Sequence, residues 1–189
     1  MQSMGIRLVL IVLILVCGGG MYLAVDTLEA APLKQAQTVA ESRFGTDLIA
    51  LCQGATQARG VLPANSKIGI INSVENTVFD IYDSAMPTTM KATDKSDVNV
   101  LLCLKEDKTV FDTSKYGKPA KYTCTQYERD LLGYLVDAKT GKTLDYKKFD
   151  GQTPPDCPDT ADQDWTKTGD LPDASDIITW LTRHAKSAA

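Results

Sequence analysis

The stretch LGYLVDAKTGKTLDYKKF, residues 132–149, contains two β-rich segments on either side of a short turn. Residues 132–138 and 143–149 are enriched in the β-branched and aromatic side chains that strands favour. Between them, residues 137–142 include Gly141, which can adopt the positive φ angle that a tight turn requires. The stretch therefore predicts an antiparallel β-hairpin.

Four more segments have the same strand character, at residues 67–72, 78–82, 98–105 and 121–127. None shows the 3.6-residue spacing of apolar side chains that indicates an amphipathic helix. We expect loops at 88–97 and 112–119, and a long irregular segment at 152–172, which holds four prolines. These segments predict an antiparallel β-sheet of about five or six strands.

Helices are expected before and after this sheet. Between residues 31 and 51, apolar side chains recur every three or four positions, with Pro32 suited to the first turn and Gly54 beyond the end. The stripe consists of Leu33, Ala36, Ala40, Phe44, Leu48 and Leu51. A C-terminal helix is predicted to start at Asp173 or Ser175, and its apolar side includes Trp180. The predicted fold class is therefore α+β.

The N-terminal segment 8–25 contains no charged residue. Eighteen helical residues are the lower limit for crossing a bilayer core. Arg7 precedes the segment and Asp26 follows it, so the positive-inside tendency places the N-terminus in the cytoplasm and the rest of the chain outside. We expect a short cytoplasmic N-terminus at 1–7, a transmembrane helix at 8–25 and an extracytoplasmic α+β domain at 26–189. This predicts a single-pass protein of the cell membrane.

Other interpretations of this segment remain open. A signal peptide could be cleaved near Cys17, although the apolar run resumes at 21–25. Lipidation of Cys17 would require a small residue before it, where the chain has Val16. The start also resembles that of pilins in having a glycine, Gly5, before an apolar run, but Leu10 stands where pilins usually have a glutamate.

Small residues in the segment suggest a helix partner within the membrane. Gly20 and Ala24 are four positions apart and share one face of a helix, where small side chains let another helix approach closely. We therefore expect that a protein partner could bind through the transmembrane helix.

The four cysteines beyond this segment, Cys52, Cys103, Cys124 and Cys157, predict two disulfides in an extracytoplasmic domain. Four cysteines permit three connectivities. Cys103 and Cys124 fall in neighbouring predicted strands, so we expect them to pair and leave Cys52 for Cys157. The spacing lacks a Cys-x-x-Cys arm and the chain has a single histidine, His184, which disfavours a zinc site.

The cysteine pattern resembles a loose set of uncharacterised bacterial exported domains of unknown function. The matching motifs are LCQG at 51–54, Cys103 in a strand, CTQY at 124–127, AKTG at 138–141, GQTPPDCP at 151–158, GDLP at 169–172 and WL at 180–181. The resemblance implies a disulfide framework over most of the chain after residue 51, and it brings no activity with it.

Acidic residues gather near the C-terminal end of the chain. Asp159, Asp162 and Asp164 are weak candidates for calcium ligands, because carboxylates are the oxygen ligands that calcium prefers. Lys167, however, stands where a calcium loop needs its glycine, so a solvated acidic loop is the simpler interpretation. No cofactor-binding motif is present, and the net charge of −4 disfavours nucleic-acid binding.

Taken together, the sequence favours a non-enzymatic function. We expect a membrane-anchored extracytoplasmic accessory or interaction domain, a candidate subunit of a membrane complex. The alternatives are a small exported hydrolase that uses carboxylates and a pilin-like filament subunit. His184 alone does not make a catalytic triad, and the cysteines are expected to be oxidised.

Overall fold

A computed structural model describes the backbone of residues 24–187 and the side chains of residues 32–184. The predicted anchor therefore lies almost wholly outside the described residues, as do Gly20 and the side chain of Ala24. Within the described part, none of the helices combines the length and apolar character that a membrane span requires. The chain divides into two compact units, residues 1–36 and 37–189, and the fold below is that of the second.

The second unit begins within helix α2, Ala24–Leu51, which contains the helix predicted at 31–51. From Gln37 onward the buried positions include Ala40, Phe44 and Leu48, which continue the predicted stripe. The helix is interrupted at Gly45, whose φ of 77° and ψ of 152° are not helical. Only glycine adopts this conformation without strain. A short 3-10 helix, η1, Cys52–Gly54, follows.

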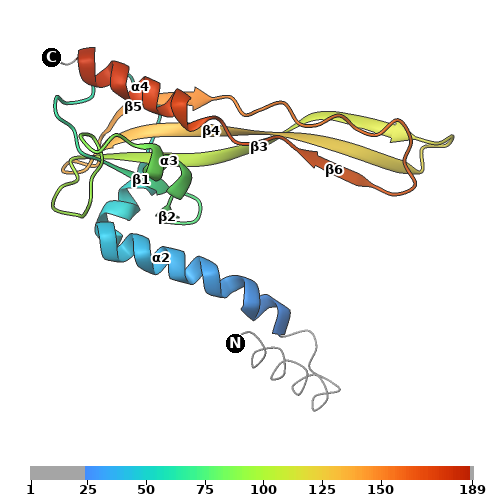
Figure 1. Ribbon diagram of the computed structural model, residues 1–189, viewed down its shortest axis with the longest axis horizontal. Coiled ribbons are helices and arrows are strands. Elements are labelled where there is room, and N and C mark those ends of the chain that lie inside the picture. The colour runs from blue at the N-terminus through green and yellow to red at the C-terminus, as the bar shows by residue number, and fades with distance from the viewer. Residues whose placement is uncertain (1–23, 188–189) are drawn as a thin grey trace, which may run out of the picture. The chain divides into compact units, whose positions relative to one another are not determined.

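The described residues form one mixed sheet of six strands, in the order β2-β1-β3-β4-β5, with β6 beside β4 (Figure 1). The strands are β1 Ile68–Asn72, β2 Thr77–Val78, β3 Val100–Tyr116, β4 Tyr122–Asp137, β5 Thr143–Phe149 and β6 Trp165–Thr168. The predicted hairpin at 132–149 is present as β4 and β5. An entirely antiparallel sheet was a wrong expectation, because β1 runs parallel to β3 and β6 runs parallel to β4.

The segment predicted as a strand at 78–82 is largely helical, because α3 spans Asp80–Ala85. Its apolar side chains Phe79, Tyr82 and Met86 are spaced by three and four and pack into one core. This helical spacing outweighs the high strand propensity of the individual residues. The C-terminal helix is present as α4, Ala174–Ser187.

The sheet separates two apolar clusters. Along β3, Val100, Leu102 and Leu104 belong to the cluster that includes side chains of α3 and α4. Leu101 and Cys103, which alternate with them, belong to the cluster on the other face, which includes residues of α2 from Ala40 to Ile49. Side chains alternate between the faces of a strand, so the continuous apolar run at 100–104 is what a strand covered on both faces needs.

Beyond these layers β3 and β4 continue as a long ribbon, defined here as residues 105–116 and 122–131 (Figure 1). The predicted loop at 112–119 was wrong, because β3 extends to Tyr116 and only residues 117–121 form the turn. The predicted strands 121–127 and 132–138 likewise form the single strand β4. Polar, exposed residues in this part of β3 give the ribbon the composition of a loop.

Candidate interaction surface

The ribbon exposes one edge of β3, which we call the open edge, residues 105–116. β4 pairs with β3 along this whole length, whereas β1 pairs with β3 only as far as Leu104. Ser73 closes that last position, because its N–H and Oγ both donate to the carbonyl of Leu104, at 2.9 and 3.1 Å. No described strand pairs with the open edge. Such an edge presents backbone donors and acceptors to another strand.

A β-bulge lies at the middle of the open edge. Val110 opposes Tyr127 and Asp112 opposes Gln126, so Phe111 is the additional residue. Val110 and Phe111 are 59% and 52% exposed. Two neighbouring large apolar side chains at the centre of an unpaired strand edge are unusual for a surface, and they indicate a contact site.

The other edge of the ribbon is covered. β6 pairs with β4 from Cys124 to Tyr127. Residues 150–164, which precede β6, are also bound to the ribbon, and we call this segment the clamped loop. Tyr116 donates through its hydroxyl to the carbonyl of Pro158 at 2.6 Å, and Gln126 Nε2 donates to the carbonyl of Pro155 at 2.9 Å. These contacts leave β3 as the open side.

Two disulfides are present among the described residues, but their pairing differs from our expectation. Cys52 pairs with Cys103 and Cys124 pairs with Cys157, with Cα–Cα distances of 5.3 and 6.1 Å. The hairpin register explains the difference, because Cys103 lies opposite Tyr134 and Cys124 opposite Ser114. The two strand cysteines are thus far apart along the ribbon, and each binds a cysteine from another segment.

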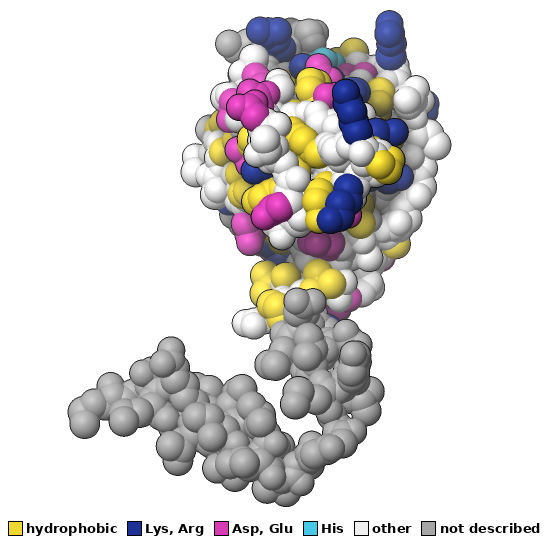
Figure 2. Space-filling model, turned by 90° about the vertical axis from the view of Figure 1, so that its right-hand side faces the viewer, with side chains coloured by type: hydrophobic (Ala, Val, Ile, Leu, Met, Phe, Trp, Pro, Cys, Tyr) yellow, Lys and Arg dark blue, Asp and Glu magenta, His cyan; other side chains and the backbone are white. Residues whose placement is uncertain are grey.

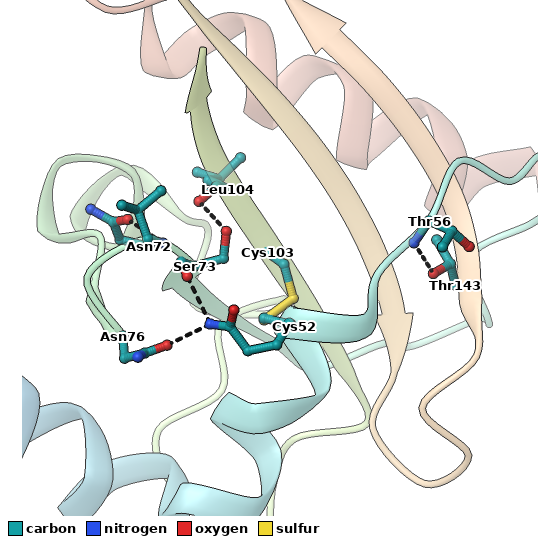
Figure 3. Close-up of a disulfide and its surroundings, with 10 residues drawn as sticks. Cys52, Thr56, Asn72, Ser73, Asn76, Cys103, Leu104 and Thr143 are labelled. Atoms are coloured by element: carbon teal, nitrogen blue, oxygen red, sulfur yellow. Dashed lines mark hydrogen bonds between the residues drawn. A yellow bond between two sulfur atoms is a disulfide. The ribbon is translucent and has the colours of Figure 1, made fainter. Parts of the chain in front are cut away.

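The Cys52–Cys103 bond fastens the end of α2 to the sheet (Figure 3). Beside it, Gln53 Nε2 donates to the carbonyl of Ser73 and to Asn76 Oδ1, at 2.8 and 2.9 Å. The backbone N–H of Thr56 donates to Thr143 Oγ1 at 3.1 Å. Cys52 and Cys103 are buried. The disulfide is therefore structural, since reactive cysteines lie in partly exposed positions.

Charges on the ribbon are arranged unevenly. Near its base, Arg129 donates two hydrogen bonds to the carboxylate of Glu106, at 2.8 and 2.9 Å. These bonds hold the pKa of Glu106 below its usual value. The far end carries the exposed Lys115, Lys118 and Lys121. Figure 2 shows this end, with Lys and Arg side chains mainly on one side and acidic side chains mainly on the other.

The calcium candidates do not form a site. The described residues contain no group of three or more acidic, histidine or cysteine side chains placed to hold a metal ion. Asp164 instead accepts hydrogen bonds from the backbone N–H and Oγ1 of Thr123, at 2.8 and 3.1 Å. Asp159 and Asp162 are exposed in the clamped loop.

Sequence reasoning missed the contact of His184 with a buried acid. His184 Nε2 lies 2.6 Å from Asp145 Oδ2, and Nδ1 lies 3.2 Å from the carbonyl of Trp180. Asp145 is on β5 at a position that faces the core, where an acidic side chain needs a partner. No signal of this is present in the sequence, because simple alternation puts Asp145 on the strand face of Lys147 and Phe149, and the apolar Leu144 and Tyr146 on the other face. A groove of about 450 Å³ lies beside this pair, between β5 and α4.

The buried carboxylates among the described residues are Asp83, Asp130 and Asp145. Each has a cationic or histidine partner, Arg43 and Lys91 for Asp83, Lys148 for Asp130 and His184 for Asp145. The hydrogen bond to Asp130 raises the pKa of Lys148. A general acid of the glycosidase type requires a carboxyl group with a raised pKa. Asp83 and Asp130 are instead placed as partners of cationic side chains, and Asp145 as the partner of His184.

Comparisons with known proteins gave no match to a family model, to a curated protein or to a solved structure.

Proposed function

We propose that this chain is an extracytoplasmic interaction domain, held at the membrane by its N-terminal apolar segment, and that its ribbon binds another protein. The observation that carries the proposal is the open edge of β3, with Val110 and Phe111 exposed at its centre. Addition of a strand to an exposed sheet edge is a common mode of protein recognition, in which backbone hydrogen bonds give affinity and side chains give specificity.

The clamped loop supports this role because it fixes the ribbon in one conformation. An isolated two-stranded ribbon is marginally stable in water. Here β6 adds a third strand, and the Cys124–Cys157 disulfide attaches the preceding loop. A binding element that is ordered before binding loses less entropy when the complex forms.

The two disulfides support a location outside the cytoplasm, because disulfides persist in oxidising compartments and are rare in the cytosol. Alkylation of the chain directly in cells, followed by mass measurement, tests this part of the proposal. We expect Cys52, Cys103, Cys124 and Cys157 to be protected from alkylation. Four reactive thiols would exclude an oxidising compartment.

The hydrolase alternative receives less support, because Asp83, Asp130 and Asp145 are each engaged by a cationic or histidine side chain. Of the three, the pKa of Asp83 lies below its usual value because Arg43 and Lys91 donate hydrogen bonds to its carboxylate, which is the opposite of what a general acid requires. The interaction role requires no such group.

A photo-reactive amino acid at Phe111, in the full chain in its own cells, tests the ribbon as a binding element. The matched control carries the same group at Thr140, an exposed turn residue between β4 and β5. We expect a covalent adduct from position 111 and none from position 140. Equal adducts from both positions, or none from either, would contradict the proposal.

A further inference from the structure

The bulge determines which strand edges can pair with the open edge. Glu106, Lys108 and Val110 lie opposite Leu131, Arg129 and Tyr127 of β4, and beyond the bulge Thr113 and Lys115 lie opposite Thr125 and Thr123. These β4 residues alternate regularly, so all five β3 side chains share one face. The other face has Asp107, Thr109, Asp112, Ser114 and Tyr116 by the same register. Two residues that share a face but lie on either side of the bulge, such as Val110 and Thr113, are therefore separated by an odd number of positions in the sequence.

A two-fold axis perpendicular to the sheet relates two antiparallel edges and keeps every side chain on the same face as its opposite partner. When the open edge pairs with its own copy across the bulge, a residue before the bulge lies opposite a residue after it. The two residue numbers must then add to an odd sum, because residues on one face differ by an odd number across the bulge. In a strand without a bulge the sum would have to be even. The bulge at Phe111 thus selects a small set of registers for self-pairing.

In one of these registers, residues 105–116 pair with themselves along their full length, and Val110 and Phe111 lie next to the axis. Glu106 then lies opposite Lys115 of the second copy, Thr109 opposite Asp112 and Lys108 opposite Thr113, each pair occurring twice. The next permitted register in one direction would place Asp107 opposite Asp112, and in the other direction Lys108 opposite Lys115. Like charges directly opposite each other are destabilising.

We infer that the partner of the open edge is a second copy of this chain, joined through antiparallel pairing of the two β3 edges with Val110 and Phe111 at the axis. This inference rests on the proposed function and names its partner. The exposed apolar side chains of both copies are buried against one another at the centre, and the pairs of Glu106 and Lys115 lie on either side of them.

Lysines on a strand edge usually prevent pairing, but the contacts of Lys108 explain its place here. Its Nζ lies 4.5 Å from the centre of the Tyr127 ring, on the same sheet. The side chain is thus held over the face of the ribbon and leaves the backbone edge accessible. In the inferred register it lies opposite Thr113, a neutral residue.

Substitutions at Thr109 and Thr113 test the register, because both residues are exposed on the open edge. In the inferred register, Thr109 lies opposite an acidic residue of the second copy and Thr113 lies opposite a basic one. Thr109→Lys places a cation opposite Asp112, and Thr109→Asp places an anion there. We expect the first to lower and the second to raise the Kd of the dimer about tenfold, since each change occurs twice. At Thr113, opposite Lys108, the signs reverse, with Asp tightening and Lys weakening.

Light scattering of the full chain over a range of concentrations measures these constants, and thermal melts confirm that each variant is folded. The reversal of sign between the two positions is specific to this register. A wild-type chain that stays monomeric at every concentration, or variants that all shift the dimer in one direction, would overturn the inference.

Disulfide trapping tests the same contact by geometry. In a Cys17→Ser background, a Thr109→Cys chain is mixed with an Asp112→Cys chain under mild oxidation. The two positions lie directly opposite in the inferred register, within the Cα separation that a disulfide needs. The control mixes Thr109→Cys with Ser114→Cys, which is on the same face but displaced along the strand. We expect a linked dimer in the first mixture, and equal linkage in both would overturn the register.

The photo-adduct from position 111 separates this inference from the proposed function. An adduct of two copies of the chain supports both. An adduct with a different protein keeps the ribbon as a binding element and overturns the self-pairing. Failure to form any adduct overturns both.

Discussion

Asp83 of α3 accepts two hydrogen bonds from the guanidinium of Arg43 of α2, at 2.9 and 3.1 Å, and Lys91 Nζ lies 2.8 Å from the same carboxylate. The apolar residues of α3 and those of α2 belong to clusters on opposite faces of the sheet. The ion pair therefore connects the two outer layers. Arg43 also donates to the carbonyl of Ala92 at 2.6 Å, which fixes its position.

Replacement of Arg43 by Met should destabilise the fold. Asp83 would keep its ion pair with Lys91 but lose the two hydrogen bonds that Arg43 donates. A buried carboxylate with too few hydrogen-bond partners is unfavourable. We expect a loss of about 2 kcal/mol in the free energy of unfolding, less than for a pair with no remaining partner. Urea denaturation at neutral pH measures it. The exposed Arg59→Met serves as the control and should change stability by less than about 0.5 kcal/mol.

The same carboxylate should make stability depend on pH. Burial alone would raise the pKa of Asp83, but the hydrogen bonds from Arg43 and Lys91 outweigh it, and the pKa lies below its usual value. The Asp83 carboxylate therefore binds a proton more readily in the unfolded chain than in the folded one. Its contribution to the free energy of unfolding is complete above about pH 4 and is lost as the pH falls through the folded-state pKa. Asp83→Asn should reduce the acid dependence of the unfolding free energy between neutral pH and pH 2. An unchanged dependence would contradict this assignment.

How far the fold could be predicted varies between its elements. The part of the hairpin in which β4 pairs with β5 was predicted within about a residue, because a local turn signal and strand propensity coincide there. That β4 is one continuous strand from Tyr122 onward was not predicted. The parallel placement of β1 beside β3 depends on the path of residues 73–99 and has no local signal. Residues 112–116 of β3 were expected to belong to a loop because they are polar or exposed on both faces, so that apolar alternation is absent.

The Cys124–Cys157 disulfide should stabilise the clamped loop more than the sheet. It closes a segment with a sequence separation of 33 residues, which in the chain-entropy model corresponds to about 3 to 4 kcal/mol. In the double variant Cys124→Ser, Cys157→Ser we expect faster amide exchange at residues 150–164, while 100–104 stay protected. The matched variant Cys52→Ser, Cys103→Ser removes a bond inside the core and should lower the protection of 100–104. Equal effects in both variants would argue against a local role for the clamp.

His184 should hold α4 against β5 through Asp145. In His184→Ala the carboxylate of Asp145, which is buried, would lose its partner at 2.6 Å. We expect a loss of about 2 to 3 kcal/mol, measured by urea denaturation. Adding Asp145→Asn should recover part of this loss, because the neutral side chain is less costly to bury. If the double variant lost as much stability as the two single variants lose together, the two residues would act independently.

Less of the candidate site than of the fold was predictable. Four oxidised cysteines could be inferred from their number, but their pairing depends on the register of β3 and β4. Cysteines across a hairpin face each other only when they are equally distant from the turn, and Cys103 lies farther from it than Cys124. The bulge at Phe111 has no marker in the sequence, since the extra residue appears only when both strands are aligned.

Gly169 should be required for the path of the clamped loop. It is buried, its N–H donates to the carbonyl of Tyr127 at 2.9 Å, and a Cβ there would collide with the carbonyl oxygen of Gln152. Gln152 cannot move away freely, because its own N–H donates to the carbonyl of Asp170 at 2.9 Å. Gly169→Ala should therefore destabilise the fold by about 1 to 3 kcal/mol and speed amide exchange in β6.

Gly54→Ala is the matched control for this glycine, because a Cβ at Gly54 meets no atom within 4 Å. We expect little change in its unfolding free energy. If Gly169→Ala also left stability and the exchange of β6 unchanged, the close approach of Gly169 to Gln152 would not constrain the loop. If it loosened the loop, photo-crosslinking from Phe111 in that variant would show how far binding at the open edge depends on a fixed ribbon.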